Sequence, residues 1–236
     1  ILSSQDEKSL SVPKLVLGEK IDSLIILGSM DSSYLKLLEE RAHVPIVYVD
    51  FYDDKEQEDR VISNGFYGTY QLTNYLFERG HEDIAFVGTL LATKSITDRF
   101  LGYQKAMMEH GKLTSDKWII PDRDRERVCY DKILLPKEMP TAFVCNCDLT
   151  ACKLIKSLQE EGYRVPEDVS VVGYDDFLMS GLCDVEITSY GVDMENMAEA
   201  TIEVILKRMR GLYDKKGMYV VEGYFAEKES VQPRII

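Results

Sequence analysis

The stretch Val165-Pro-Glu-Asp-Val-Ser-Val-Val-Gly-Tyr-Asp-Asp176 decides the fold. Three of its valines form a short β-branched run between Pro166 and Gly173. This pattern is typical of a strand that is covered on both faces in a parallel sheet. In open α/β sheets, ligands bind just beyond the carboxyl ends of such strands. Because Asp175 and Asp176 follow the run at that point, we expect two carboxylates at a polar binding site.

Strand and helix patterns alternate on both sides of this stretch. Further strands are predicted at 23–28, 45–50, 84–88, 141–147, 218–221 and 224–226. Helices are predicted at 34–41, 66–79, 98–110, 129–135, 149–161 and 194–210. We expect Asp148 to be the N-cap of the fifth helix, and the charged run 53–60 to be a solvated loop. The alternation, with short turns at glycines, predicts an α/β fold with parallel sheets.

Composition places the chain among soluble globular proteins. Its 236 residues are enough for one large domain or two small ones, and 45% are hydrophobic and 29% charged. No apolar run approaches the ~20 residues of a membrane span. The first eight residues lack the basic and apolar regions of a signal peptide, so we expect a cytoplasmic protein with no membrane contact.

The charge of the chain bears on nucleic-acid binding. A formal net charge of −13 predicts that this sequence repels phosphate backbones. If the protein contacts DNA, we therefore expect another segment to make that contact.

The cysteines predict a reduced protein. Their number is odd and they lie in apolar or strand-like surroundings: Cys129, Cys145, Cys147, Cys152 and Cys183. Residues 145 and 147 would share one face of a strand, and residue 152 follows a helical turn later, so a metal site is an alternative. The spacing matches no standard zinc pattern and no histidine is near in sequence, which favours core thiols.

Three polar residues near strand ends and helix starts are the candidates for a binding site: Asp50, Asp175 and Arg99. Carboxylates accept hydrogen bonds from hydroxyl groups, and a guanidinium donates several in a fixed fork, so this set suits a polyhydroxylated neutral ligand. Each has a structural alternative: either acid could cap a turn or helix, and Arg99 could pair with Asp98 or a surface acid. The common nucleotide-binding and hydrolase motifs are absent from the sequence, which disfavours an enzyme.

Several short motifs occur in a fixed order along the chain. They are GHEDIAFVG at 80–88, RxxGY at 99–103, PTAFV at 140–144, EGYRVPEDVSVVGYDD at 161–176, IT at 187–188 and KES at 228–230. Each motif alone is weak. The ordered set, from about Ile21 onward, resembles the lactose/galactose repressor (LacI/GalR) family.

The resemblance implies the effector-binding core of such a regulator. This core is periplasmic-binding-protein-like: two Rossmann-like lobes with parallel sheets, joined by three crossover strands, hold a small molecule between them. The first lobe would comprise residues 1–62 and 193–219, and the second 63–191 and 222–236, with crossovers near 62–64, 190–192 and 220–222. Family members are usually homodimers whose N-terminal helix-turn-helix reads operator DNA, and ligand binding shifts lobe closure and so DNA affinity.

The resemblance also assigns ligand contacts. Asp50, Arg99 and Asp175 fall on family ligand-contact positions. Cys147 stands where the family commonly has Asn, and Asn146, one place earlier, would point to the opposite face of the strand.

Two further positions depart from sugar-binding members. Leu27 and Val192 stand where some of these members carry polar contacts. We therefore expect a sugar-like ligand that is smaller or less polar than a hexose, or one that is held by other groups such as Tyr190.

The main hypothesis is thus an effector-sensing regulator core with no catalytic residue, metal or cofactor. Its DNA-binding head, and the first strand and helix of the first lobe, are expected to lie outside this sequence. One alternative is a sugar-binding protein of a transport system, which the missing leader and free thiols disfavour. Another is a hydrolase or transferase that acts through Asp50 and Asp175.

Overall fold

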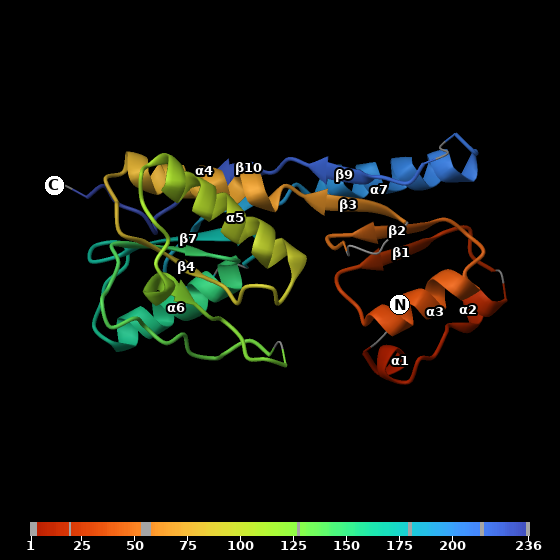
Figure 1. The fold of residues 1–236 in the computed structure, drawn as a ribbon, viewed down its shortest axis with the longest axis horizontal. Helices are drawn as coiled ribbons and strands as arrows, with labels where there is room; N and C mark the ends of the chain where they lie inside the picture. Colours follow the sequence, from red (N-terminus) through yellow and green to blue (C-terminus); the bar gives the residue numbers. More distant parts are fainter. Residues whose placement is uncertain are drawn as a thin grey trace. The chain divides into compact units, whose positions relative to one another are not determined.

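The computed structural model describes residues 4–18, 20–52, 58–126, 128–178, 181–212 and 215–234. The chain forms two units, whose elements are labelled in Figure 1. The first contains the residues up to Ser63 together with Asp193–Val221, and the second contains Asn64–Val192 together with the residues from Glu222 onward. The chain therefore passes from one unit to the other three times. Each unit is described separately below.

The first unit is built on a four-stranded parallel sheet in the order β1-β2-β3-β9. Its strands are β1 (Leu24–Leu27), β2 (Ile46–Val49), β3 (Asp59–Ser63) and β9 (Met218–Val221). Its helices are α1 (Ser4–Lys8), α2 (Lys14–Leu17), α3 (Ser32–Arg41) and α7 (Met194–Met209). Two of the predicted helices are thus present with ends shifted by one or two residues.

The strand β3 corrects one prediction. The run 53–60 was expected to be solvated, and its residues 53–57 lie outside the described part of the chain. Asp59, however, is 1% exposed and begins β3. Its carboxylate accepts hydrogen bonds from the guanidinium of Arg208 on α7, which neutralises the buried charge. The prediction was wrong for Asp59 because its partner is far away in the sequence.

The second unit is built on a six-stranded sheet in the order β10-β8-β7-β6-β4-β5, parallel except for β10. Its strands are β4 (Ile84–Val87), β5 (Ile119–Ile120), β6 (Ala142–Cys145), β7 (Ser170–Asp175), β8 (Thr188–Gly191) and β10 (Tyr224–Ala226). Its helices are α4 (Gly65–Glu78), α5 (Lys94–Glu109), α6 (Asp148–Glu160) and the short 3-10 helix η1 (Asp116–Trp118).

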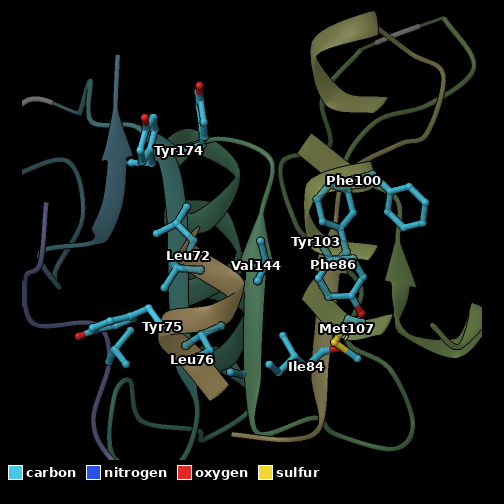
Figure 2. Close-up of a cluster of buried hydrophobic side chains, with 14 of the residues drawn as sticks. Leu72, Tyr75, Leu76, Ile84, Phe86, Phe100, Tyr103, Met107, Val144 and Tyr174 are labelled. Atoms are coloured by element: carbon cyan, nitrogen blue, oxygen red, sulfur yellow. Dashed lines mark hydrogen bonds between the residues drawn. The ribbon is translucent and has the colours of Figure 1, made fainter. Parts of the chain in front are cut away.

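The side chains of each central strand alternate between two apolar layers. Ile84 and Phe86 of β4 pack with α4 and α5, whereas Ala85 and Val87 pack with α6. Figure 2 shows the first of these layers, in which Tyr174 lies at the end away from Ile84. Because both faces of the sheet are covered, β7 is buried along almost its whole length, as its valine run predicted.

Two helix predictions in this unit need correction. Thr93 caps α5, so this helix begins four residues before the predicted position and Arg99 lies in its second turn. No helix forms at 129–135. Instead, the carbonyl of Tyr130 accepts from Lys153, and the backbone N–H of Ile133 donates to Ser157 of α6, so α6 takes backbone groups that a local helix would use.

None of the described helices combines sufficient length with an apolar stretch that could cross a bilayer.

Candidate functional site

The carboxyl end of β7 has an unusual backbone. Asp175 has φ 95° and Asp176 has φ 55°, in the left-handed region that non-glycine residues rarely occupy. The N–H of Val192 donates to the carbonyl of Asp175 at 3.1 Å, which helps to hold this conformation. Strained residues persist where the surroundings fix them, and they cluster at binding sites. This strand end is therefore the starting point for the site.

Arg99 reaches the neighbouring strand from α5. Its side chain is 7% exposed, and its Nη1 donates to the carbonyl oxygen of Asn146 at 2.6 Å. The guanidinium carbon lies 3.8 Å from the ring centroid of Tyr174, a cation–π contact that aligns the planar group. Because Arg99 is buried, it does not form the ion pair with a surface acid that was considered as an alternative. Arg99 is thus a fixed cation near the ends of β6 and β7.

Cys147 lies between these groups at the N-cap position of α6. Burial raises the pKa of its thiol. A hydrogen bond with the hydroxyl of Thr150, at 3.3 Å, lowers it; the charge of Asp175 raises it and that of Arg99 lowers it. The structure therefore brings together three of the predicted site residues, one from each of β7, α5 and the start of α6.

Asn146 points away from this group, as the strand alternation predicted. Its amide nitrogen donates to the carbonyl of Val87 at 3.0 Å and to the carboxylate of Asp122 at 2.9 Å. This amide is therefore committed to holding β4 and β6 together.

Asp148 is a site residue that the sequence did not reveal. It was expected to be an N-cap, but Cys147 occupies that position and Asp148 is the first residue of α6. Its side chain is 2% exposed, and Oδ1 accepts a hydrogen bond from the hydroxyl of Ser189 on β8 at 2.8 Å. A Cβ atom at position 173 would come within 2.0 Å of this oxygen, so a larger residue there would displace the Asp148 carboxylate.

The electrostatic surroundings of Asp148 are unfavourable for its charged form. Burial raises the pKa of its carboxyl to about 7, and the charges of Asp175 and Asp176 add to this. The Ser189 hydroxyl and the cation of Lys228 act in the opposite direction. Three acids therefore crowd the end of β7, one of them with a pKa near neutrality.

Asp176 has structural partners. Lys228 forms an ion pair with its Oδ1, and the hydroxyl of Tyr224 on β10 donates to its Oδ2 at 3.1 Å. These bonds tie the end of β7 to the edge of the sheet, which gives Asp176 a structural role.

Tyr190 lies in a packed position on β8. Its ring is 2% exposed and stacks on that of Tyr174 at a centroid distance of 5.7 Å. Its hydroxyl accepts from the N–H of Gly223 at 2.9 Å and donates to Glu222 at 3.3 Å. A ligand would have to share this hydroxyl with Gly223 and Glu222. The role of Tyr190 as a ligand contact therefore stays a prediction.

Asp50 belongs to the first unit, whereas the other four predicted residues belong to the second. It is exposed, follows β2 and has φ 58°. Its N–H donates to the carbonyl of Val61 at 2.9 Å, which extends the pairing with β3. Leu27 ends the neighbouring strand β1 and is 68% exposed.

The cysteines do not gather as a metal site. Cys145 packs in the apolar layer beneath α6, and Cys152 bonds to the carbonyl of Leu182. Within the described ranges, no group of three or more His, Cys, Asp or Glu residues is arranged to hold a metal ion. The chemistry offered at the end of β7 is hydrogen bonding, by carboxylate acceptors, a guanidinium donor and a thiol.

Comparisons with known proteins agree with this architecture. A family model described as a periplasmic binding protein-like domain matches residues 73–231. The HTH-type transcriptional repressor PurR of Vibrio atlanticus is 28% identical over 231 residues, which cover 96% of this chain and 69% of that protein.

Solved structures share the fold. A transcriptional regulator CelR–cellobiose complex has a TM-score of 0.79 at 24% identity, covering 97% of this chain and 71% of that one. A LacI family regulator from Enterococcus faecium with bound ribose has a TM-score of 0.78 at 18% identity, covering 97% and 86%. The predicted fold class and the resemblance to LacI/GalR effector-binding domains are thus confirmed, and the chain belongs to the family of periplasmic binding protein-like domains.

Proposed function

We propose that this chain is the effector-sensing core of a LacI/GalR-type transcription regulator. It binds a small sugar-like molecule, and binding changes the affinity of an N-terminal head for operator DNA. The observation that carries the proposal is the cluster of Arg99, Cys147 and Asp175 at the carboxyl ends of β6 and β7. Ligands of open α/β sheets bind at this edge.

The chemistry of the cluster supports a ligand with hydroxyl groups. Asp175 accepts hydrogen bonds from hydroxyls, and the charged form of such a bond contributes about 1.5–3 kcal/mol. The Arg99 guanidinium, held over the Tyr174 ring, donates in a fixed direction without losing much rotamer freedom. Cellobiose and ribose, the ligands of the two structural relatives, belong to this class.

Cys147 limits the class of ligand that the site can bind. A thiol donates only weakly, so a ligand that requires an amide here would leave a polar group unpaired at a cost of about 1–3 kcal/mol. The ligand is therefore less polar on the side that faces Cys147 than one read by an asparagine. In the first unit, Asp50 is the residue that we propose as a ligand contact.

The charge and the relatives support a regulator over a transport protein or an enzyme. The net charge of −13 requires that DNA contact comes from another segment. The named relative is a repressor, and the structural relatives are regulators. We place the protein in the cytoplasm as a homodimer.

A ligand screen tests the proposal. Thermal-shift measurements over sugars, sugar phosphates and nucleobases should yield a compound that raises the melting temperature of the wild type. Asp175→Asn and Arg99→Ala should each abolish that shift, while circular dichroism shows an intact fold. Arg99→Lys, which keeps the charge but loses the planar fork, should weaken binding and guards against misfolding of the alanine variant.

Matched controls are available in the same unit. Asp184 and Arg125 are exposed, so Asp184→Asn and Arg125→Ala should leave the thermal shift unchanged. A ligand whose affinity survived both Asp175→Asn and Arg99→Ala would refute the site assignment.

A further inference from the structure

Two cysteines that are distant in sequence lie together in the second unit. Cys152 is in α6, and Cys183 is in the segment that connects β7 to β8. The Sγ of Cys152 lies 3.3 Å from the carbonyl oxygen of Leu182, the residue directly before Cys183. Both side chains pack against the same apolar layer beneath the sheet. The Cys152 thiol of α6 therefore faces the backbone segment that carries Cys183.

The two thiols also interact with each other. Burial raises the pKa of the Cys152 thiol to about 12, and a hydrogen bond with the Cys183 thiol adds to this. Both are free and half-buried, so a small molecule can reach them. Cys145 differs in this respect because it is buried. Thiol–disulfide exchange requires proximity and access and proceeds through a thiolate, so the raised pKa of Cys152 slows attack by this thiol without preventing it.

We propose that Cys152 and Cys183 form a redox-sensitive pair, which a small-molecule disulfide such as oxidised glutathione converts into an intrachain disulfide bond. The first protein thiolate attacks one sulfur of the oxidant, forms a mixed disulfide and releases one thiolate. The second protein thiolate then attacks the protein sulfur of the mixed disulfide and releases the other. The two protein thiols are oxidised, the oxidant is reduced to two thiols, and the released thiolates take up the protons.

The bond would join α6 to the β7–β8 connection. This connection starts at Asp176 and leads into β8 at Thr188, next to Ser189, whose hydroxyl donates to Asp148. A link across it restricts the unfolded chain and so raises the melting temperature of the oxidised protein. Because disulfides in reducing compartments are usually transient, the bond acts as a modification and is not required for folding.

The test is disulfide mapping in glutathione buffers of increasing oxidised fraction. The purified full chain and three variants, Cys152→Ser, Cys183→Ser and Cys129→Ser, are alkylated, digested and analysed by mass spectrometry. Cys129 is exposed, so its variant is the matched control. Wild type and Cys129→Ser should give a peptide that links residues 152 and 183, and should run as monomers on a non-reducing denaturing gel. The other two variants should lack the peptide.

Two results would overturn the proposal. One is the absence of the linked peptide in a large excess of oxidised glutathione, and the other is a link that appears only in a covalent dimer band. Oxidised Cys129→Ser should also melt at a higher temperature than its reduced form, while Cys152→Ser should not. None of these readouts involves an effector, so their failure would leave the proposed function untouched.

Discussion

Two carboxylates of the second unit are almost equally buried, but their pKa values shift in opposite directions. Asp122 and Asp148 are 1% and 2% exposed. Burial raises the pKa of Asp122, but hydrogen bonds from Arg123, the N–H of Thr89 and Asn146 outweigh it and lower the pKa to about 2. Asp148 has a hydroxyl donor and two acids nearby, and its pKa rises to about 7. The donors around a buried acid, and not its depth, decide its charge.

The donors mark the surroundings of Asp122 as structural, whereas the proposed binding region lies around Asp148. The Asp122 carboxylate accepts hydrogen bonds from the N–H of Thr89, the Asn146 amide and the Thr150 hydroxyl, and the guanidinium of Arg123 neutralises its charge. Around Asp148, burial and the charges of Asp175 and Asp176 outweigh the Ser189 hydroxyl and the cation of Lys228, so the charged form of this carboxyl is disfavoured. Strongly shifted pKa values of this kind cluster at functional sites, which agrees with the proposed site.

Asp122→Ala should have the largest effect. It removes the acceptor of the Thr89 N–H and the Asn146 amide, and leaves the largely buried Arg123 without its partner. Breaking a buried pair in this way costs about 3–5 kcal/mol. Urea unfolding followed by the fluorescence of Trp118, the sole tryptophan, reports this loss in the second unit.

Glu126→Ala is the control, because Glu126 is exposed. It should change the free energy of unfolding by less than about 0.5 kcal/mol. If Asp122→Ala unfolded at the same urea concentration as this control, the region would not be structural.

Asp148→Asn should have a smaller effect that depends on pH. The pKa of Asp148 is raised in the folded state, so its contribution is fully present below about pH 4 and is lost as pH rises to about 7. Each pKa unit corresponds to about 1.4 kcal/mol. The variant removes the charge and can still accept from Ser189, so it should be more stable than wild type at pH 8.

Unfolding measured at several pH values between 4 and 8 checks this prediction, with Asp184→Asn as a control that should follow the wild type. The contribution of Asp122 to stability has the opposite pH dependence, because its pKa is lowered in the folded state. This contribution is lost as pH falls from about 4 to about 2. An Asp148→Asn variant less stable than wild type at pH 8 would contradict the assigned role of burial.

Lys228→Gln should have the smallest effect. The lysine side chain is 33% exposed, and its ion pair with Asp176 is worth less than about 1 kcal/mol at low salt. The difference from wild type should shrink when unfolding is repeated at high salt. The cation also lowers the pKa of Asp148, so its removal should extend the loss of stability to higher pH. An unchanged pH profile would show that Lys228 does not act on Asp148.

Much of the second unit could be predicted from local patterns. The valine run placed β7, and apolar periodicity with terminal glycines placed α4 within one residue at each end. The acids at the end of β7 followed directly from this strand. Arg99, chosen from its place near a helix start, and Cys147, chosen through the family resemblance, do lie close to Asp175, although their part in binding stays a prediction.

The remaining features depend on contacts between distant residues. Asp148 has the position and residue type of an N-cap, so the local pattern concealed its burial against Gly173 and Ser189. Asp59 was hidden in a charged run because its partner, Arg208, lies 149 residues later. The region near Ile133 has apolar residues at helical spacing, but the backbone N–H of Ile133 donates to the hydroxyl of Ser157. A single sequence gives no signal for these pairings.

The most direct test of the proposed site is the dissociation constant of the best ligand from the screen, measured by calorimetry for wild type, Asp175→Asn and Asp184→Asn. Loss of a charged hydrogen bond of about 1.5–3 kcal/mol weakens binding at least ~10-fold. We therefore expect Asp175→Asn to bind at least ~10-fold more weakly and Asp184→Asn to match the wild type. Equal dissociation constants for wild type and Asp175→Asn would contradict effector binding at the end of β7.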